Sequence, residues 1–88
     1  MSELRIHHLS FSGDSMSVAF SDERIIVVAL GNFPRLRDAR PSQREQWCLI
    51  GRGLGVHWAE LDEDLSVENI LGAYSRGKAS AYAHAARI

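Results

Sequence analysis

The chain has 88 residues, of which 45% are hydrophobic and 24% are charged, and its formal net charge at pH 7 is −1. This length fits one domain, and the near-neutral charge argues against nonspecific nucleic-acid binding by the molecule as a whole. The longest apolar run, Ile25 to Leu30, is far shorter than the roughly 20 residues of a membrane-spanning helix. A single cysteine, Cys48, cannot form an intrachain disulfide, and no segment has the pattern of a signal peptide. We therefore expect a cytoplasmic protein without a membrane partner.

The first thirty residues predict three antiparallel strands. Apolar and polar side chains alternate over residues 4–11 and over residues 15–21, which is the period of a strand with one buried face. Residues 25–30 are apolar throughout and mostly β-branched, so this strand should be the most buried. The polar connections, Ser12 to Asp14 and Ser21 to Arg24, are short, which favours an antiparallel meander.

The segment after the third strand predicts a basic loop and a first helix. Residues 35–40 form an irregular, arginine-rich loop that ends before a proline. Ser42 and Glu45 have the spacing of a capping box, in which a hydroxyl and a carboxylate satisfy free N–H groups of the first turn. We therefore expect a helix over residues 42–50 that docks Trp47 onto the sheet.

The last third of the chain predicts a fourth strand and a second helix. Residues 54–58 are mostly apolar and favour an edge strand beside the meander. Ser66 is placed to cap a helix, and Leu65 and Ile70 have the spacing of a hydrophobic staple across its start. The second helix should therefore begin just after Ser66.

These elements define an α+β fold with two layers. We expect a three- to four-stranded, mainly antiparallel sheet, which starts with the N-terminal meander and packs against two short helices. The single domain should occupy residues 1–74. Residues 75–88 are rich in alanine and have little apolar surface to bury, so they predict a poorly ordered C-terminal tail.

Charge is distributed unevenly along the chain. Between residues 35 and 52, five arginines oppose only Asp38 and Glu45, a local balance of +3: Arg35, Arg37, Arg40, Arg44 and Arg52. Five acidic residues follow without a basic one, a local balance of −5: Glu60, Asp62, Glu63, Asp64 and Glu68. Such polarity can steer a charged partner or let two copies of the chain meet, although two solvated faces are the plainer interpretation. The first four arginines could also follow the phosphates of a nucleic acid, an alternative that no helix-turn-helix pattern supports.

His57 with Asp62, Glu63 and Asp64 is the constellation that could carry chemistry. It offers one nitrogen and several oxygens to a weakly bound metal ion or a catalytic site, but it lacks the spacing of structural zinc sites and of calcium loops. A structural role is simpler, because the carboxylates can accept N–H groups of the turn and His57 can orient it by bonding one of them. Cys48 should be an ordinary half-buried thiol in the first helix, with no base assigned to it. We therefore assign no catalytic, metal-binding or cofactor-binding residue and expect a protein that is not an enzyme.

The most characteristic segments of the chain also indicate a family. The chain resembles the domain-of-unknown-function family 2442 over about residues 4–74. Four segments carry the resemblance: Phe33-Pro34-Arg35-Leu36, the helix start from Ser42 to Trp47, Gly55-Val56-His57-Trp58, and Leu61 to Val67. Ala59 departs from the family pattern, because members commonly have proline after the tryptophan.

The resemblance implies a small α+β domain with an antiparallel sheet. It also implies a gene that often lies next to one for another small protein, an arrangement similar to toxin–antitoxin pairs. We therefore predict an interaction module, antitoxin-like, that covers a small cognate protein encoded nearby, and two copies could also pair through a sheet edge. Arginine and tryptophan often anchor interfaces. The candidate interaction residues are Arg35, Arg37, Arg40, Arg44, His57, the exposed part of Trp58, Asp62, Glu63 and Asp64.

Overall fold

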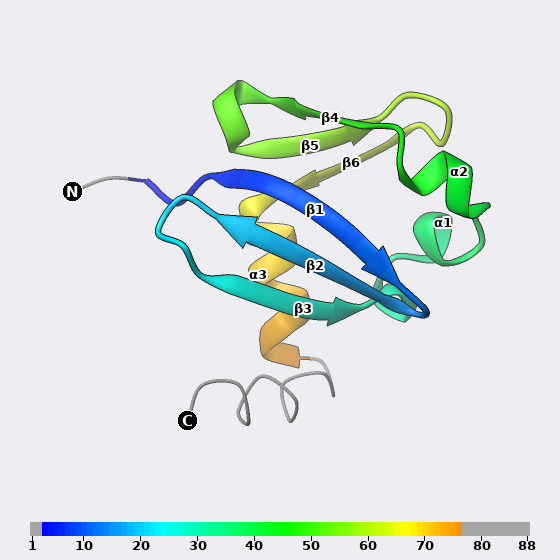
Figure 1. Cartoon of the computed structure of the whole chain (residues 1–88), viewed down its shortest axis with the longest axis horizontal. Helices are drawn as coiled ribbons and strands as arrows, with labels where there is room; N and C mark the ends of the chain where they lie inside the picture. The colour runs from blue at the N-terminus through cyan, green and yellow to red at the C-terminus, as the bar shows by residue number, and fades with distance from the viewer. Residues whose placement is uncertain (1–2, 77–88) are drawn as a thin grey trace.

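The computed structural model describes residues 3–76, which contain two three-stranded antiparallel sheets and a C-terminal helix (Figure 1). The first sheet has the strand order β1-β2-β3, with β1 (Ile6–Ser12), β2 (Ser15–Phe20) and β3 (Ile25–Ala29). This is the meander that the sequence predicts. Its alternation is also confirmed, because Met16, Val18 and Phe20 are all buried along β2.

The second sheet is formed by residues 47–66 and was not predicted. Its order is β4-β5-β6, with β4 (Trp47–Ile50), β5 (Gly55–Trp58) and β6 (Glu63–Ser66). The α+β class is confirmed, but two sheets of three strands replace the expected single sheet of three to four. Short 3-10 helices connect the elements at η1 (Leu30–Asn32) and η2 (Gly51–Gly53).

The helix expected over residues 42–50 is wrong. Two one-turn helices, α1 (Pro34–Arg37) and α2 (Pro41–Arg44), occupy the basic segment, and the chain is extended from Trp47 onward. A helical turn does start here, because the Gln43 side-chain Oε1 accepts the Arg40 N–H at 2.9 Å. Pairing with β5 then overrides the local helical signal, since a strand partner supplies backbone hydrogen bonds that local propensity does not include.

The second helix is confirmed as α3 (Val67–Arg76). Ser66 caps it: its Oγ accepts the Asn69 N–H at 3.0 Å, and the Asn69 Oδ1 accepts the Ser66 N–H at 2.8 Å. This helix includes Ser75 and Arg76, two residues past the boundary expected at residue 74. The rest of the predicted tail, residues 77–88, lies outside the described residues.

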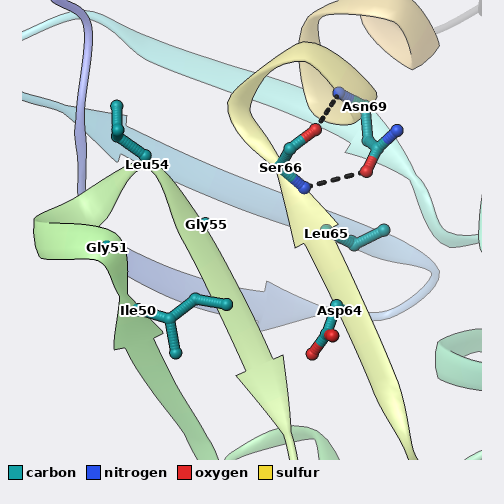
Figure 2. Close-up of a pocket in the computed structure, with 8 residues that line it drawn as sticks. All are labelled: Ile50, Gly51, Leu54, Gly55, Asp64, Leu65, Ser66 and Asn69. Carbon is teal, nitrogen blue, oxygen red and sulfur yellow. Dashed lines mark hydrogen bonds between the residues drawn. The ribbon is translucent and has the colours of Figure 1, made fainter.

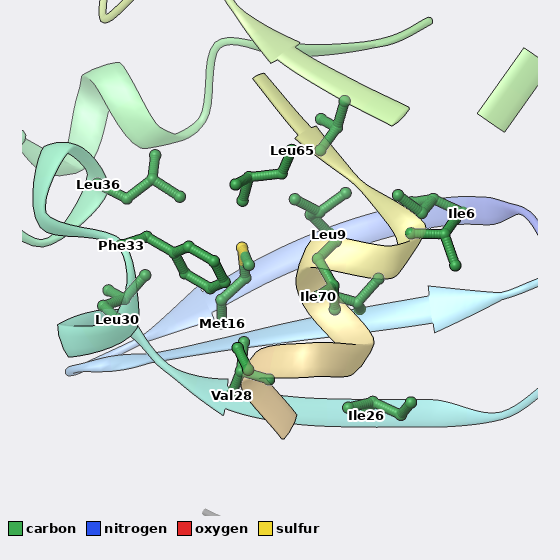
Figure 3. Close-up of a cluster of buried hydrophobic side chains, with 14 of the residues drawn as sticks. Ile6, Leu9, Met16, Ile26, Val28, Leu30, Phe33, Leu36, Leu65 and Ile70 are labelled. Carbon is green, nitrogen blue, oxygen red and sulfur yellow. The ribbon is translucent and has the colours of Figure 1, made fainter. Parts of the chain in front are cut away.

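One hydrophobic cluster lies between the two sheets and α3 (Figure 3). The first sheet contributes Leu9 and Met16, the second contributes Leu65, and α3 contributes Ile70, all of which converge in the same core. Because both sheets share this core, each sheet has an inner face that is buried and an outer face that no other described layer covers. No helix in residues 3–76 is long and apolar enough to span a membrane.

Candidate functional site

Arg35 and Arg44 bind carbonyl groups of their own chain. The Arg35 Nη1 donates to the carbonyl oxygens of Leu61 and Asp62, each at 3.2 Å, and so holds the connection between β5 and β6. The Arg44 Nε and Nη2 donate to the carbonyl oxygens of Leu36 and Arg37, each at 2.8 Å. The Arg35 guanidinium therefore joins the basic segment to the second sheet, and the Arg44 guanidinium closes the turns within the basic segment.

Arg37 and Arg40 are exposed. Arg37 forms an ion pair with its neighbour Asp38, with Nε 2.9 Å from Oδ1. This hydrogen bond raises the pKa of the Arg37 guanidinium and lowers the pKa of the Asp38 carboxyl below its ordinary value. The four arginines therefore do not form one row of free cations, because two of them bind backbone and a third has a carboxylate beside it.

The expectation that part of Trp58 is exposed is wrong. Trp58 has 0% of its surface exposed, and it is the largest of the fully buried side chains among the described residues. Its indole Nε1 donates to the Arg44 carbonyl oxygen at 2.9 Å, so its polar atom is also satisfied. A side chain that is fully buried in the core cannot anchor a partner, so Trp58 is not part of an interaction site.

The acidic residues do not form one turn. Asp62 lies in the connection between β5 and β6 with a left-handed φ of 53°, whereas Glu63 and Asp64 belong to β6. Side chains alternate along a strand, so these two point to opposite faces of the second sheet. Glu63 is half-buried, and Asp64 is exposed on the outer face. Within residues 3–76 no three His, Cys, Asp or Glu side chains are arranged to hold a metal ion.

The structure instead brings Cys48, His57 and Asp64 into one row across the second sheet. Cys48 pairs directly with His57, and His57 pairs directly with Asp64, so the three side chains share the outer face. His57 Nδ1 is hydrogen-bonded to the Asp64 Oδ1, which confirms that His57 bonds a carboxylate. Cys48 is a free, exposed thiol on the edge strand β4, and the half-buried helical position expected for it is wrong.

A hollow of about 320 Å³ lies next to this row on the outer face (Figure 2). Its lining is mostly apolar, and Ile50 and Leu54 beside it are 42% and 38% exposed. The floor is open because position 55 is glycine: a Cβ there would lie 3.2 Å from the Ile50 Cγ1. The hollow is lined by Ile50, Gly51, Leu54, Gly55, Asp64, Leu65, Ser66 and Asn69.

Sequence reasoning missed both the cysteine row and the hollow, because each depends on the register of three strands. One signal could have revealed them. Gly51 and Gly53 both adopt left-handed φ angles in the connection between β4 and β5. A Gly-x-Gly segment between two short apolar runs is typical of a hairpin, and it would have favoured a strand over residues 47–50.

The comparisons with known proteins agree with this fold. The family model for "Protein of unknown function (DUF2442)" matches residues 6–75, so the chain belongs to that family and the resemblance is confirmed. The chain is also similar to a crystal structure of a protein of unknown function from Rhodospirillum rubrum ATCC 11170. The TM-score is 0.70 at 22% identity, over 81% of this chain and 88% of that one, which shows a shared fold. No curated protein matches the chain.

Proposed function

We propose that the chain is a non-enzymatic protein-interaction module, and that its partner covers the outer face of the second sheet. The observation that carries this proposal is the pair of exposed apolar side chains, Ile50 and Leu54, beside an open apolar hollow. Exposed apolar surface of this kind is typical of a binding site, because the free energy of the system falls when a partner covers the surface and removes it from water.

The edge strand β4 supports the same surface. Within residues 3–76, in the order β4-β5-β6, only one side of β4 is paired, so its other side can accept an added strand. The partner we propose is a small protein that pairs an extended apolar segment with β4 and places an apolar side chain in the hollow. Asp64 is 66% exposed at the rim, which favours a basic group on that segment.

The gene arrangement implied by the family resemblance motivates an antitoxin-like role for this module. We propose that the partner is a small cognate protein encoded next to this chain, which the chain binds in the cytoplasm and covers. Nucleic acid is the weaker alternative, because the Arg35 and Arg44 guanidinium groups already bind carbonyls of the chain. A second copy of the chain is the other possible occupant of the β4 edge.

Co-expression with the product of the neighbouring gene tests the proposal. We expect the two proteins to co-purify and calorimetry to give a defined affinity. Ile50→Glu should weaken this affinity at least about tenfold, because the substitution places a charge in an apolar contact. Ile25→Glu is the matched control, since Ile25 is an isoleucine 65% exposed on the other sheet. No complex, or equal affinities for the two variants, would exclude this surface.

A further inference from the structure

Cys48 is exposed, and a base stands directly beside it on the neighbouring strand. The two residues are cross-strand partners on one face, which places their Cβ atoms about 4.5–5.5 Å apart. A thiol reacts as the thiolate, so a neighbouring group that removes its proton determines how readily it reacts. His57 is placed to be that group.

Asp64 sets the orientation of the His57 ring. Because the Asp64 carboxylate accepts the Nδ1–H, the neutral ring keeps its lone pair on Nε2. Nδ1 faces β6, so the opposite edge of the ring, which includes Nε2, faces β4 and Cys48. No hydrogen bond joins the Cys48 thiol to the ring among the described residues, so the proton transfer requires the thiol to move up to Nε2. The row thus has a nucleophile, a base and a positioning carboxylate in that order.

We propose that Cys48 is a modification site that takes a thiol group from a low-molecular-mass disulfide, with His57 as the base. The Cys48 proton moves to His57 Nε2, and Sγ attacks one sulfur of the disulfide. The disulfide bond breaks as the new S–S bond forms, and the leaving thiolate takes the proton from His57. Cys48 is oxidised to a mixed disulfide, and the released half of the reagent is reduced to a free thiol.

The attached group has a place on the same face. Cys48 and Ile50 are two residues apart on β4, so both point outward, and the hollow opens beside them. Its volume, about 320 Å³, is at the small end of ligand pockets and suits a short thiol. A group held there would occupy the surface where the partner docks, so modification should block docking. This effect rests on the proposed function, whereas the modification site itself does not.

Cystamine, a small cationic disulfide, is the probe, because the exposed Asp64 carboxylate attracts its ammonium group. The rate of mixed-disulfide formation is measured by mass spectrometry on the folded chain and on the chain unfolded in urea. We expect the folded chain to react at least about tenfold faster at neutral pH, and His57→Gln to remove this acceleration. His7→Gln is the control, since His7 is an exposed histidine on β1 of the first sheet.

The pH dependence separates a base from a merely structural residue. The rate for the unfolded chain should fall about tenfold per pH unit below neutrality, as its thiolate fraction falls. The rate for the folded chain should fall less over the same pH range. The rate for the His57→Gln variant should fall as steeply as that of the unfolded chain. Asp64→Asn weakens the positioning contact, so its rate should fall to an intermediate extent. Equal rates for the folded and unfolded chains, or an unchanged rate in His57→Gln, would overturn the site.

Partner binding is tested separately. The cystamine-modified chain should bind its partner at least about tenfold more weakly, and reduction should restore the affinity. Cys48→Ser treated with cystamine should bind like the unmodified chain. If the modified chain binds as tightly as the unmodified one, the regulatory effect is excluded. If the unmodified chain binds no partner, the proposed function fails and the rate measurements still decide the modification site.

Discussion

The two sheets use their outer faces differently. On the first sheet the outer face pairs Ser10 with Ser17 and Ser12 with Ser15, and its strand β3 adds Ile25, which is 65% exposed. On the second sheet the outer face has Cys48, Ile50 and His57, an apolar side chain next to two that can react. The inner faces of both sheets are apolar and share one core. The two outer faces differ in that the second has the row of Cys48, His57 and Asp64 beside a hollow, and this is the face to which we propose that a ligand binds.

The largest effect should come from the inner face of the second sheet. Trp58→Ala should lower the free energy of unfolding by about 3–5 kcal/mol, because it leaves a cavity and an unpaired Arg44 carbonyl. Cys48→Ala on the outer face should change it by less than about 0.5 kcal/mol. Urea denaturation of both variants checks the contrast, and similar losses would contradict the assignment of inner and outer faces.

The contact between the sheets depends on Gly53, where η2 approaches β1. A Cβ at position 53 would lie 2.8 Å from the Ile6 carbonyl oxygen, and the φ angle of +95° is one that side chains rarely adopt. Gly53→Ala should therefore cost about 1–3 kcal/mol of stability. Gly31→Ala is the control, since no atom beyond its own chain neighbours lies within 4 Å of its Cβ position. Thermal unfolding of the two variants gives the answer, and a Gly53→Ala protein as stable as the control would show that the two sheets do not depend on this contact.

The connection between β5 and β6 depends on Arg35. Arg35→Ala should remove two charge-assisted hydrogen bonds and destabilise the chain by about 1 kcal/mol, since the side chain is exposed and partly solvated. Arg37→Ala should change the stability of the chain little, because the ion pair of Arg37 with Asp38 is on the surface. Hydrogen exchange should also show faster exchange of the Asp62 N–H in Arg35→Ala only. Equal exchange in the two variants would mean that Arg35 does not hold this turn.

The smallest effect should come from Asp38, in the exposed segment between the sheets. Its pKa is lowered from the ordinary 3.8 by the hydrogen bond from Arg37. A lowered folded pKa means that the carboxylate contributes stability above the ordinary value, and that this contribution is lost as the pH falls through the folded pKa. Asp38→Asn should therefore reduce the fall in melting temperature just below pH 3.8, with no change in fold. An NMR titration of Asp38 at or above its ordinary pKa would contradict this.

Short-range sequence patterns predict the first sheet and the last helix correctly. The meander follows from alternation and short connections, and α3 follows from the Ser66 cap and the apolar stripe behind it. The contact of His57 with a carboxylate was also anticipated. The paired residues in these features are at most 14 positions apart, as Ile6 and Phe20 are, so local propensity and pattern determine them.

The failures at Cys48 and Trp58 come from one misassigned segment. Residues 42–45 have a helix-start signal, and one helical turn does form there. Taking that helix through residue 50 placed Cys48 and Trp47 on the wrong element and hid β4. It also left Trp58 without the sheet that buries it, so its side chain seemed available to a partner. Sequence reasoning thus named His57 and Asp64 for the site and missed Cys48 and the hollow.

By itself, the sequence determined the family, the α+β class, the first sheet and the last helix, because each depends on composition, motif spacing or neighbours close in the chain. Only the tertiary structure decided which side chains of the second sheet face the core and which lie on the outer face. The register of three short strands sets that choice, and a shift by one residue would turn every side chain of a strand to the other face. Packing of Trp58 and Leu65 into the shared core fixes this register, and with it the row of Cys48, His57 and Asp64.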